Sequence, residues 1–368
     1  MGIFHRLFGN ANMVAQACHT ILIVSAFWID MPYARGDWLM GFSYYQQGKY
    51  RKAVHELSAE IKDNSEDVLL NRILGLSYYQ LKDYSKAEIF LRKVRALQPD
   101  FQVALELAQV YVRRSDYGEA LQTLEESKGL IRTKQERFQF HYVFGSVLMV
   151  QGVLSKARSH FKKAELFAEK APRLYFQIGT LEYNQGNLPV ALMALERSLE
   201  IDSRQPQVMI SLGEVYLRLS STQSPPKEKA YLNRAVSLAK ETLQLNRDSV
   251  EGHSLAGRAY LGLRNFAQAA KEFRQVLVLD SSHPGILYSL GQALIGLNRC
   301  QEGVQVLEQA AKESPEDATI FYALGFCQEK SGLSLKALNA YRRAQQLGPA
   351  SKYAASVVRL EKKIEANK

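Results

Sequence analysis

A small residue recurs along this 368-residue chain at intervals close to 34 residues. The stretches MGFSYYQQGKY (40–50) and LGLSYYQLKDY (74–84) show the pattern, with a glycine, paired tyrosines and a later tyrosine in register. The small residues are Gly41, Gly75, Ala108, Gly145, Gly179, Gly213, Gly257, Gly291 and Gly325, at steps of 34, 33, 37, 34, 34, 44, 34 and 34 residues. A second small residue follows twelve positions later at Ala53, Ala87, Ala120, Ala157, Ala191, Ala269, Gly303 and Ala337, and ten positions further still at Ala235 in the sixth repeat. Such a period constrains the chain to fold as an array of similar repeats.

Each repeat predicts a helical hairpin. Its apolar residues recur at helical spacing in two runs, separated by a polar turn such as QGK, LKD or QGN. The paired small residues let two helix backbones approach closely, and the neighbouring aromatic residues fill the space that remains. Because one hairpin cannot bury its apolar face alone, we expect neighbouring hairpins to stack into a continuous core.

These residues resemble the tetratricopeptide repeat (TPR) family, whose 34-residue pattern runs leucine-glycine, tyrosine, alanine, phenylalanine or leucine, alanine and proline. Nine tandem repeats match over residues 33–349, with Ala108 replacing glycine in repeat three and Gly303 replacing alanine in repeat eight. The resemblance implies an all-α fold, a right-handed superhelical solenoid of helical hairpins.

Residues 350–368 follow the last repeat and predict a C-terminal capping helix. Tyr353, Val357, Leu360 and Ile364 fall on one helical stripe, with basic residues elsewhere. A partner-binding helix is the alternative, but a polar-backed helix is what the open end of a solenoid requires.

The period breaks near SSTQSPPKEK, residues 220–229, in repeat six. Because proline cannot sit inside a helix, we expect this insertion to lengthen the turn between the two helices of the repeat. A tolerated surface insertion is favoured over a partner-contacting loop or a modification site, since loops accept extra length at little cost. The three extra residues before repeat four also predict a longer turn.

The net charge of +10 is concentrated between residues 128 and 173, which carry ten basic and three acidic side chains. Within this segment Lys156, Arg158, Lys162 and Lys163 form a predicted basic patch. An acidic protein, an anionic lipid surface or a nucleic acid would fit such a patch. Repeat arrays that read bases need similar side chains at one position of every repeat, and here those positions vary. Nucleic acid is therefore disfavoured, and a solvated outer face is favoured.

Motifs for catalysis or cofactor binding are absent from the sequence. There is no phosphate-binding glycine loop, no metal-ligand spacing among the seven histidines, and no nucleophile motif. The three cysteines (Cys18, Cys300 and Cys327) are widely spaced and support neither a disulfide framework nor a zinc site. The sequence therefore predicts a protein that is not an enzyme and that needs no cofactor.

The TPR resemblance implies that the first helix of each repeat lines a concave groove that holds extended peptides. Counting the glycine as position eight, the groove positions two, five, nine and twelve carry no lysine and asparagine pair of the kind that clamps a C-terminal carboxylate in chaperone-binding members. The predicted partner-binding residues are Trp38, Phe42, Tyr45, Arg72, Tyr79, Gln109, Tyr142, Arg173, Phe176, Tyr183, Arg258, Tyr288 and Tyr322. Aromatic and amide side chains suit an extended peptide backbone, although aromatic residues at helical spacing are also typical of a core.

The residues therefore favour a non-catalytic protein-interaction scaffold that binds a peptide or protein in this groove. Assembly of a membrane-associated or exported complex is one setting for it. The alternative is a protein that binds nucleic acid or an anionic surface through residues 128–173.

Residues 13–29 (MVAQACHTILIVSAFWI) contain no charged residue, unlike any other stretch of the chain. A weakly basic start, an apolar run and small residues before a cleavage point after Ala26 resemble a secretory signal within residues 1–32. The run is at the short end for a membrane span. A helix docked on the first repeat and a true start at Met31 are alternatives. We expect an exported or membrane-anchored protein over a cytoplasmic one.

Overall fold

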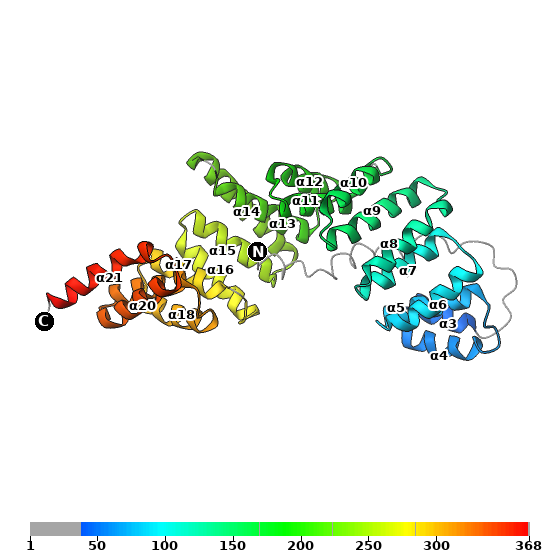
Figure 1. Cartoon of the computed structure of the whole chain (residues 1–368), viewed down its shortest axis with the longest axis horizontal. Helices are drawn as coiled ribbons and strands as arrows, with labels where there is room; N and C mark the ends of the chain where they lie inside the picture. The colour runs from blue at the N-terminus through cyan, green and yellow to red at the C-terminus, as the bar shows by residue number, and fades with distance from the viewer. Residues whose placement is uncertain (1–37, 169, 223, 284, 367–368) are drawn as a thin grey trace. The chain divides into compact units, whose positions relative to one another are not determined.

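The computed structural model describes residues 38–168, 170–222, 224–283 and 285–366, and all regular structure in these ranges is helical. The helices pair into nine hairpins, which confirms the all-α solenoid predicted from the repeat (Figure 1). The first helices are α3 (Trp38–Gln46), α5 (Val68–Gln80), α7 (Phe101–Arg113), α9 (Lys134–Val150), α11 (Pro172–Asn184), α13 (Pro206–Ser220), α15 (Val250–Gly262), α17 (Ile286–Gly296) and α19 (Ala318–Lys330). The second helices are α4 (Tyr50–Glu60), α6 (Tyr84–Leu97), α8 (Tyr117–Glu126), α10 (Leu154–Glu165), α12 (Leu188–Ile201), α14 (Pro225–Leu245), α16 (Phe266–Leu279), α18 (Cys300–Glu313) and α20 (Ser334–Leu347).

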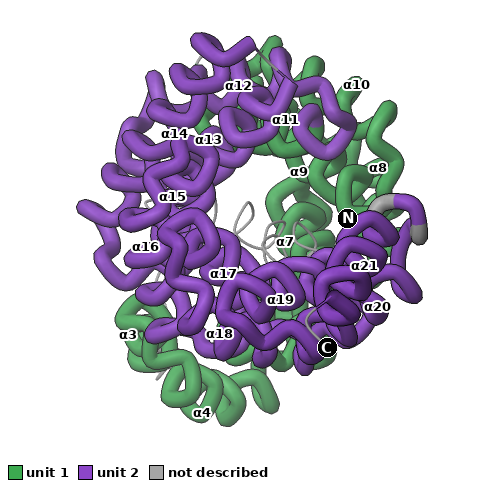
Figure 2. Tube along the Cα trace, turned by 90° about the vertical axis from the view of Figure 1, so that its left-hand side faces the viewer, with its two compact units in different colours: residues 1–181 green, residues 182–368 purple. Residues whose placement is uncertain are grey.

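The chain divides into two compact units, residues 1–181 and 182–368 (Figure 2). In each unit every helix packs on its neighbours in sequence, for example α5 on α6 and α6 on α7, or α18 on α19 and α19 on α20. The signal-like segment 1–32 lies outside the described residues. Among the described helices, none is long and apolar enough to cross a membrane.

The turn inside the hairpin has the same backbone conformation in eight repeats. The residue seven positions after the small residue has a positive φ, between 56° and 80°, at Gly48, Lys82, Ser115, Gly152, Gly186, Arg264, Asn298 and Gly332. This left-handed region favours glycine and tolerates asparagine, whereas a residue with an ordinary side chain costs roughly 1 kcal/mol there. Lys82, Ser115 and Arg264 therefore adopt the turn because the two helices that flank it require it.

The conserved spacing of small residues marks the point where the two helices of a hairpin cross. A Cβ atom on Gly75 would lie 2.8 Å from Leu91 Cγ, and one on Gly257 would lie 2.5 Å from Phe273 Cε1. Both large side chains are fully buried and lie sixteen positions after the glycine. Close packing of this kind leaves no room for a larger residue at the crossing point.

Repeat six differs from the prediction, because its insertion lengthens a helix and not the turn. Helix α14 has 21 residues where α6, α12 and α16 have 14, and only residues 221–224 separate it from α13. Pro225 and Pro226 open α14, where a missing N–H costs nothing because the first N–H groups of a helix have no partner within it. The expectation of a longer turn at residues 220–229 is therefore wrong.

The extra residues before repeat four also enter a helix. Helix α9 begins eleven residues before Gly145, whereas α5 begins seven residues before Gly75. Thr133 caps α9 by accepting a hydrogen bond from the Glu136 N–H, and Glu136 accepts one from the Thr133 N–H. This capping box starts the helix one turn early, so the predicted longer turn is replaced by an added helical turn.

The C-terminal helix α21 (Ala350–Glu365) packs on α20. Tyr353, Val357 and Leu360 are buried, and Ile364 packs beside them. On its other side, Arg359 forms two hydrogen bonds to Glu329 of α19, at 2.6 and 2.8 Å. The helix therefore caps the last repeat as predicted.

Candidate partner-binding face

Within each unit, the first helices form the side on which neighbouring repeats approach most closely. Helix α3 contacts α5 and α7 contacts α9 in unit 1, and α13, α15, α17 and α19 form a continuous series of contacts in unit 2. The second helices of successive repeats contact one another less. The closer side of a stack is the inner side of its curve, so the first helices line the concave face of each unit.

Four of the predicted groove residues are buried. Phe42, Tyr79, Gln109 and Tyr142 are 9%, 5%, 1% and 1% exposed, respectively, and the side chain of Trp38 lies outside the described residues. Phe42 packs in the core of repeats one and two, and Tyr79 and Tyr142 in that of repeats two to five. In the structure as it stands, these four side chains hold neighbouring helices together and offer little surface to a ligand.

Arg72 is held in an ion pair between repeats. Its guanidinium donates to Glu106 on α7 through Nη2 at 2.6 Å and through Nε at 3.0 and 3.2 Å. The Glu106 side chain is 2% exposed. Burial raises the pKa of Glu106, and Arg72 opposes that rise. Burial and the negative charge of Glu106 raise the pKa of the predicted groove residue Tyr45 to about 12, so its hydroxyl stays protonated.

Two predicted groove tyrosines are covered by an arginine of the following repeat. Arg113 donates to Tyr79 Oη at 3.1 Å and lies over its ring, with its guanidinium carbon 5.9 Å from the ring centroid. Arg218 donates to the backbone oxygen of Tyr183 at 3.3 Å and lies 5.3 Å from the centroid of that ring. The same pair of repeat positions therefore joins first helices in both units.

Arg258 is a further groove residue with a neighbour in the preceding repeat. Its Nη1 donates to Glu214 Oε1 at 2.5 Å, and its side chain is 40% exposed where that of Glu214 is 9% exposed. This ion pair leaves one face of the guanidinium accessible, so Arg258 can contact a ligand while it remains paired.

The remaining groove residues are accessible. Arg173 is exposed and Phe176 is partly exposed on α11, and Tyr288 and Tyr322 occupy the same position of α17 and α19. Tyr288 accepts a hydrogen bond from Gln292 at 3.1 Å. Tyr322 is 36% exposed and has the rings of Tyr341 and Tyr353 at centroid distances of 5.4 and 5.3 Å. Repeats seven to nine therefore present arginine, amide and aromatic groups on adjacent first helices.

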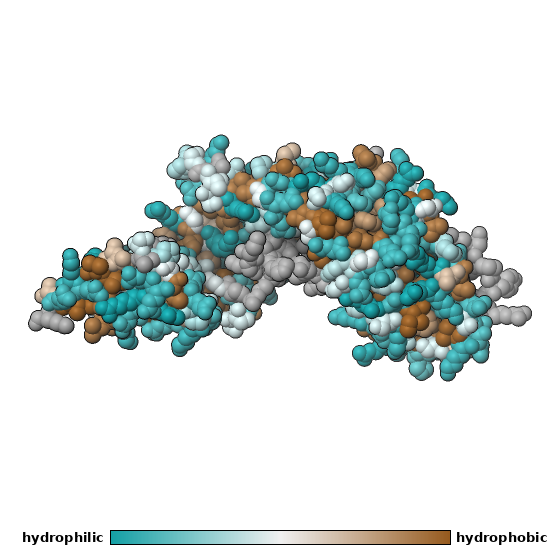
Figure 3. Space-filling model, in the orientation of Figure 1, coloured by the Kyte–Doolittle hydropathy of each residue, from teal (hydrophilic) through white to brown (hydrophobic). Residues whose placement is uncertain are grey.

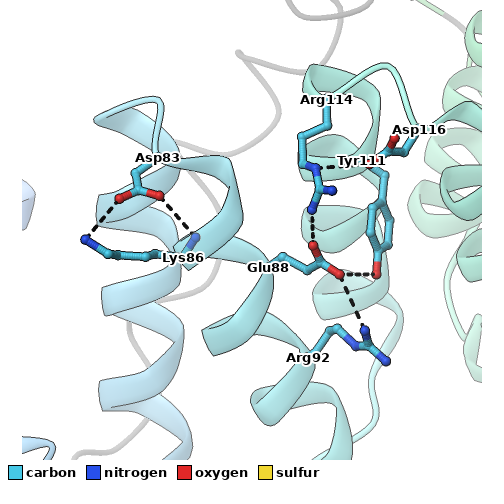
Figure 4. A network of polar contacts seen from close by, with 7 residues as sticks. All are labelled: Asp83, Lys86, Glu88, Arg92, Tyr111, Arg114 and Asp116. Carbon is cyan, nitrogen blue, oxygen red and sulfur yellow. Dashed lines mark hydrogen bonds and ion pairs between the residues drawn. The ribbon is translucent and has the colours of Figure 1, made fainter.

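Sequence reasoning missed the residues that fix the seams between second and first helices. Glu88 on α6 accepts from Tyr111 on α7 at 3.2 Å, and also pairs with Arg92 and Arg114 (Figure 4). In unit 2, Tyr216 of α13 donates to Glu196 of α12 at 2.8 Å. Tyr111 and Tyr216 lie three positions after the small residue of their repeats. That shared position was the available signal, and burial raises the pKa of both tyrosines.

The predicted basic patch lies on α10. Lys156, Lys162 and Lys163 are exposed and Arg158 is partly exposed. Burial of Glu165, the acidic residue at the end of this helix, raises its pKa, and Lys162 opposes that rise. The patch is thus a solvated face of a second helix, outside the first-helix surface.

Two histidines separate the basic patch from the core of repeat four. His141 and His160 bring their Nδ1 atoms to 3.3 Å, and His160 stacks on Phe144 with a centroid distance of 4.4 Å. Burial lowers the pKa of His160 to about 4, with His141 and Lys163 acting in the same direction. Because His160 is neutral at pH 7, it adds nothing to the positive charge of the patch.

Exposed apolar side chains are distributed over many helices. The most exposed are Leu166, Val278, Met193, Leu335 and Ile89, on or next to second helices. Hydrophobic and hydrophilic residues are interspersed over the face seen in Figure 3. Among the described residues, no group of three or more histidine, cysteine, aspartate or glutamate side chains is placed to hold a metal ion.

The fold and this face define a class of protein, an all-helical repeat array whose inner helices carry its binding surface. The tetratricopeptide repeat family model matches residues 39–101, 254–302 and 288–352. The C-terminal part of a TPR repeat-containing protein from Cytophaga hutchinsonii superposes with a TM-score of 0.54 at 13% identity, covering 69% of this chain and 99% of that one. A tetratricopeptide repeat protein from Parabacteroides merdae gives a TM-score of 0.50 at 14% identity, covering 71% and 98%. The chain belongs to the tetratricopeptide repeat family.

Two curated relatives share the repeats over part of their length. Human protein O-mannosyl-transferase TMTC1 is 24% identical over 222 residues, which are 58% of this chain and 24% of that protein. The Arabidopsis thaliana protein CTR9 homolog is 21% identical over 359 residues, which are 83% and 33%. The chain thus spans a quarter to a third of the length of these relatives. The TPR fold is typically a non-catalytic scaffold, and TPR proteins generally bind protein partners.

Proposed function

We propose that this protein is a non-catalytic scaffold that binds an extended peptide or protein segment on the first helices of repeats seven to nine. One observation carries the proposal: Arg258, Tyr288 and Tyr322 stay accessible on three adjacent first helices, while the comparable residues of repeats two to four are buried or paired. Aromatic side chains and a guanidinium are the groups that contribute most to protein recognition. Amide groups such as Gln292 can hydrogen-bond a peptide backbone.

A peptide selection tests this function. Peptides are selected from a random displayed library on the full chain, and their affinity is measured again on the Tyr288→Ala/Tyr322→Ala variant. We expect a loss of about tenfold or more, as for interface residues that carry much of the binding energy. Val278→Ala/Leu335→Ala is the matched control, since these residues are 77% and 69% exposed on second helices. Peptides that bind both variants equally well would overturn the proposal.

A second candidate, binding to a polyanion or anionic membrane, rests on the exposed lysines of α10. Neutralising Lys156, Arg158, Lys162 and Lys163 together should reduce the salt dependence of binding to a nucleic acid by about 0.9 per lost phosphate contact. Unchanged binding to every polyanion tested excludes this candidate.

The address of the protein is also a proposal. We propose that residues 13–29 direct export or membrane anchoring, so that the scaffold serves a membrane-associated or exported complex. The absence of charge in this segment supports the proposal.

A further inference from the structure

Cys300 and Cys327 lie together although 27 residues separate them in sequence. Cys300 is the first residue of α18, in repeat eight, and Cys327 lies in α19, in repeat nine. The Cys327 thiol donates to Cys300 Sγ at a distance of 3.2 Å, and both side chains are free thiols. The two residues are 8% and 0% exposed. A small movement of either side chain would bring the sulfur atoms to bonding distance, since a disulfide has an S–S length of about 2 Å.

A departure from the repeat pattern provides the space for this pair. Repeat eight has Gly303 where seven other repeats have alanine at the same position. A Cβ atom on Gly303 would lie 2.9 Å from Cys327 Sγ, which is closer than real Cβ atoms approach a neighbour. The missing methyl group therefore makes room for the thiol of Cys327 beside that of Cys300.

We propose that Cys300 and Cys327 form a thiol pair that a low-molecular-weight disulfide, such as oxidised glutathione, converts to an intrachain disulfide. The thiolate of Cys300 attacks one sulfur of the small disulfide, forms a mixed disulfide and releases one thiol. Cys327 then gives up its proton and attacks Cys300 Sγ, which releases the second thiol. Both cysteines are oxidised, the small disulfide is reduced to two thiols, and the two cysteine protons end on those thiols.

The positions of the two cysteines assign these roles. Cys300 is the more accessible of the two and stands at a helix N-terminus, where the backbone N–H groups favour negative charge. Burial and the hydrogen bond with Cys300 raise the pKa of the Cys327 thiol, so Cys327 reacts second, when its neighbour already carries the leaving group.

The bond would join the second helix of repeat eight to the first helix of repeat nine. These helices otherwise meet through apolar packing of residues such as Leu307 and Leu324. Because each repeat of a solenoid is stabilised by its neighbours, a covalent link across this seam would oppose local opening of the last two repeats. Helix α19 also carries Tyr322, so the state of the thiol pair bears on the proposed binding face.

Peptide mapping of the full chain tests the proposal, in a Cys18→Ser background that leaves two cysteines. After equilibration with a mixture of reduced and oxidised glutathione and alkylation of free thiols, trypsin releases peptides 300–312 and 313–330, one with each cysteine. We expect these two peptides to be joined by a disulfide, and hydrogen exchange in α18 and α19 to slow by about tenfold or more on oxidation. The Cys327→Ser variant should carry only a glutathione adduct on Cys300.

Two outcomes would overturn the proposal. Both cysteines could remain alkylated at every glutathione ratio, or Cys300 of the two-cysteine protein could stop at the glutathione adduct. The mapping decides the matter on the protein with both cysteines, so the result does not depend on whether Cys327→Ser folds.

Discussion

Replacing Arg72 by methionine should destabilise the seam between repeats two and three, because it leaves the buried carboxylate of Glu106 without its counter-ion. Two unit charges 3.0 Å apart, the distance from Arg72 Nε to Glu106 Oε2, attract each other by about 5.5 kcal/mol at an effective dielectric constant of about 20. Burial offsets much of this attraction, and losing one partner of a buried pair typically costs about 3–5 kcal/mol.

Protonation of Glu106 limits the cost. Its pKa is raised in the folded state, so the stability it contributes is fully present below the unfolded value of about 4.3 and is lost as the pH rises through the folded pKa. Without Arg72 the folded pKa rises further, and the variant folds with a neutral carboxyl group. Holding that proton at pH 7 costs about 1.36 × 2.7, or roughly 3.7 kcal/mol. The loss relative to the unmodified protein should therefore grow as the pH rises above the folded pKa of the unmodified protein, by at most about 1.4 kcal/mol per pH unit.

Urea unfolding and hydrogen exchange of α5 to α7 at pH 4.5, 6 and 7.5 measure this loss. Arg342→Met is the matched control, since it breaks an ion pair with Glu361 that also joins two helices but is 53% and 34% exposed, and it should cost less than about 1 kcal/mol. The double variant Arg72→Met/Glu106→Leu should recover most of the stability, because no buried charge remains. A loss at pH 7.5 no larger than that of the control, or one that is equal at all three pH values, would refute the reasoning.

Three further outcomes are expected. Gly257→Ala should destabilise unit 2 by about 1–3 kcal/mol, because the added methyl group overlaps a fully buried phenylalanine ring, whereas Gly118→Ala, with open space around it, should be neutral or gain up to about 1 kcal/mol; chemical unfolding compares the two. Arg264→Gly should stabilise the protein by up to about 1 kcal/mol, because it removes a Cβ atom from a left-handed turn, and Asn298→Gly should gain less; equal gains would contradict the strain argument. Residues 1–40 fused to a reporter enzyme active only outside the cytoplasm should give activity, and deletion of the apolar run should abolish it; a silent intact fusion would rule out export.

The sequence period was sufficient to predict the hairpins and the cap because both depend on local pattern. The stripe of Tyr353, Val357 and Leu360 identified the buried side of α21 before any neighbour was known. The insertion in repeat six could not be placed in the same way. Proline breaks the interior of a helix but suits its first turn, so Pro225 fits either a longer turn or a longer helix. Packing of the added turns decides between them, and packing is not written in a local pattern.

The candidate binding face was harder to predict, because a groove position can serve a ligand or the next repeat. A residue at such a position has the equivalent residue of the next repeat 34 positions along the chain, or 44 across the insertion. Arg72 and Glu106 are 34 apart and Arg258 and Glu214 are 44 apart, and in both cases the opposite charges pair. Tyr288 and Tyr322 are also 34 apart, but two tyrosines gain little from each other at that position and both stay accessible. Opposite charges one period apart therefore indicate a seam between repeats, and aromatic residues one period apart indicate a surface left for a partner.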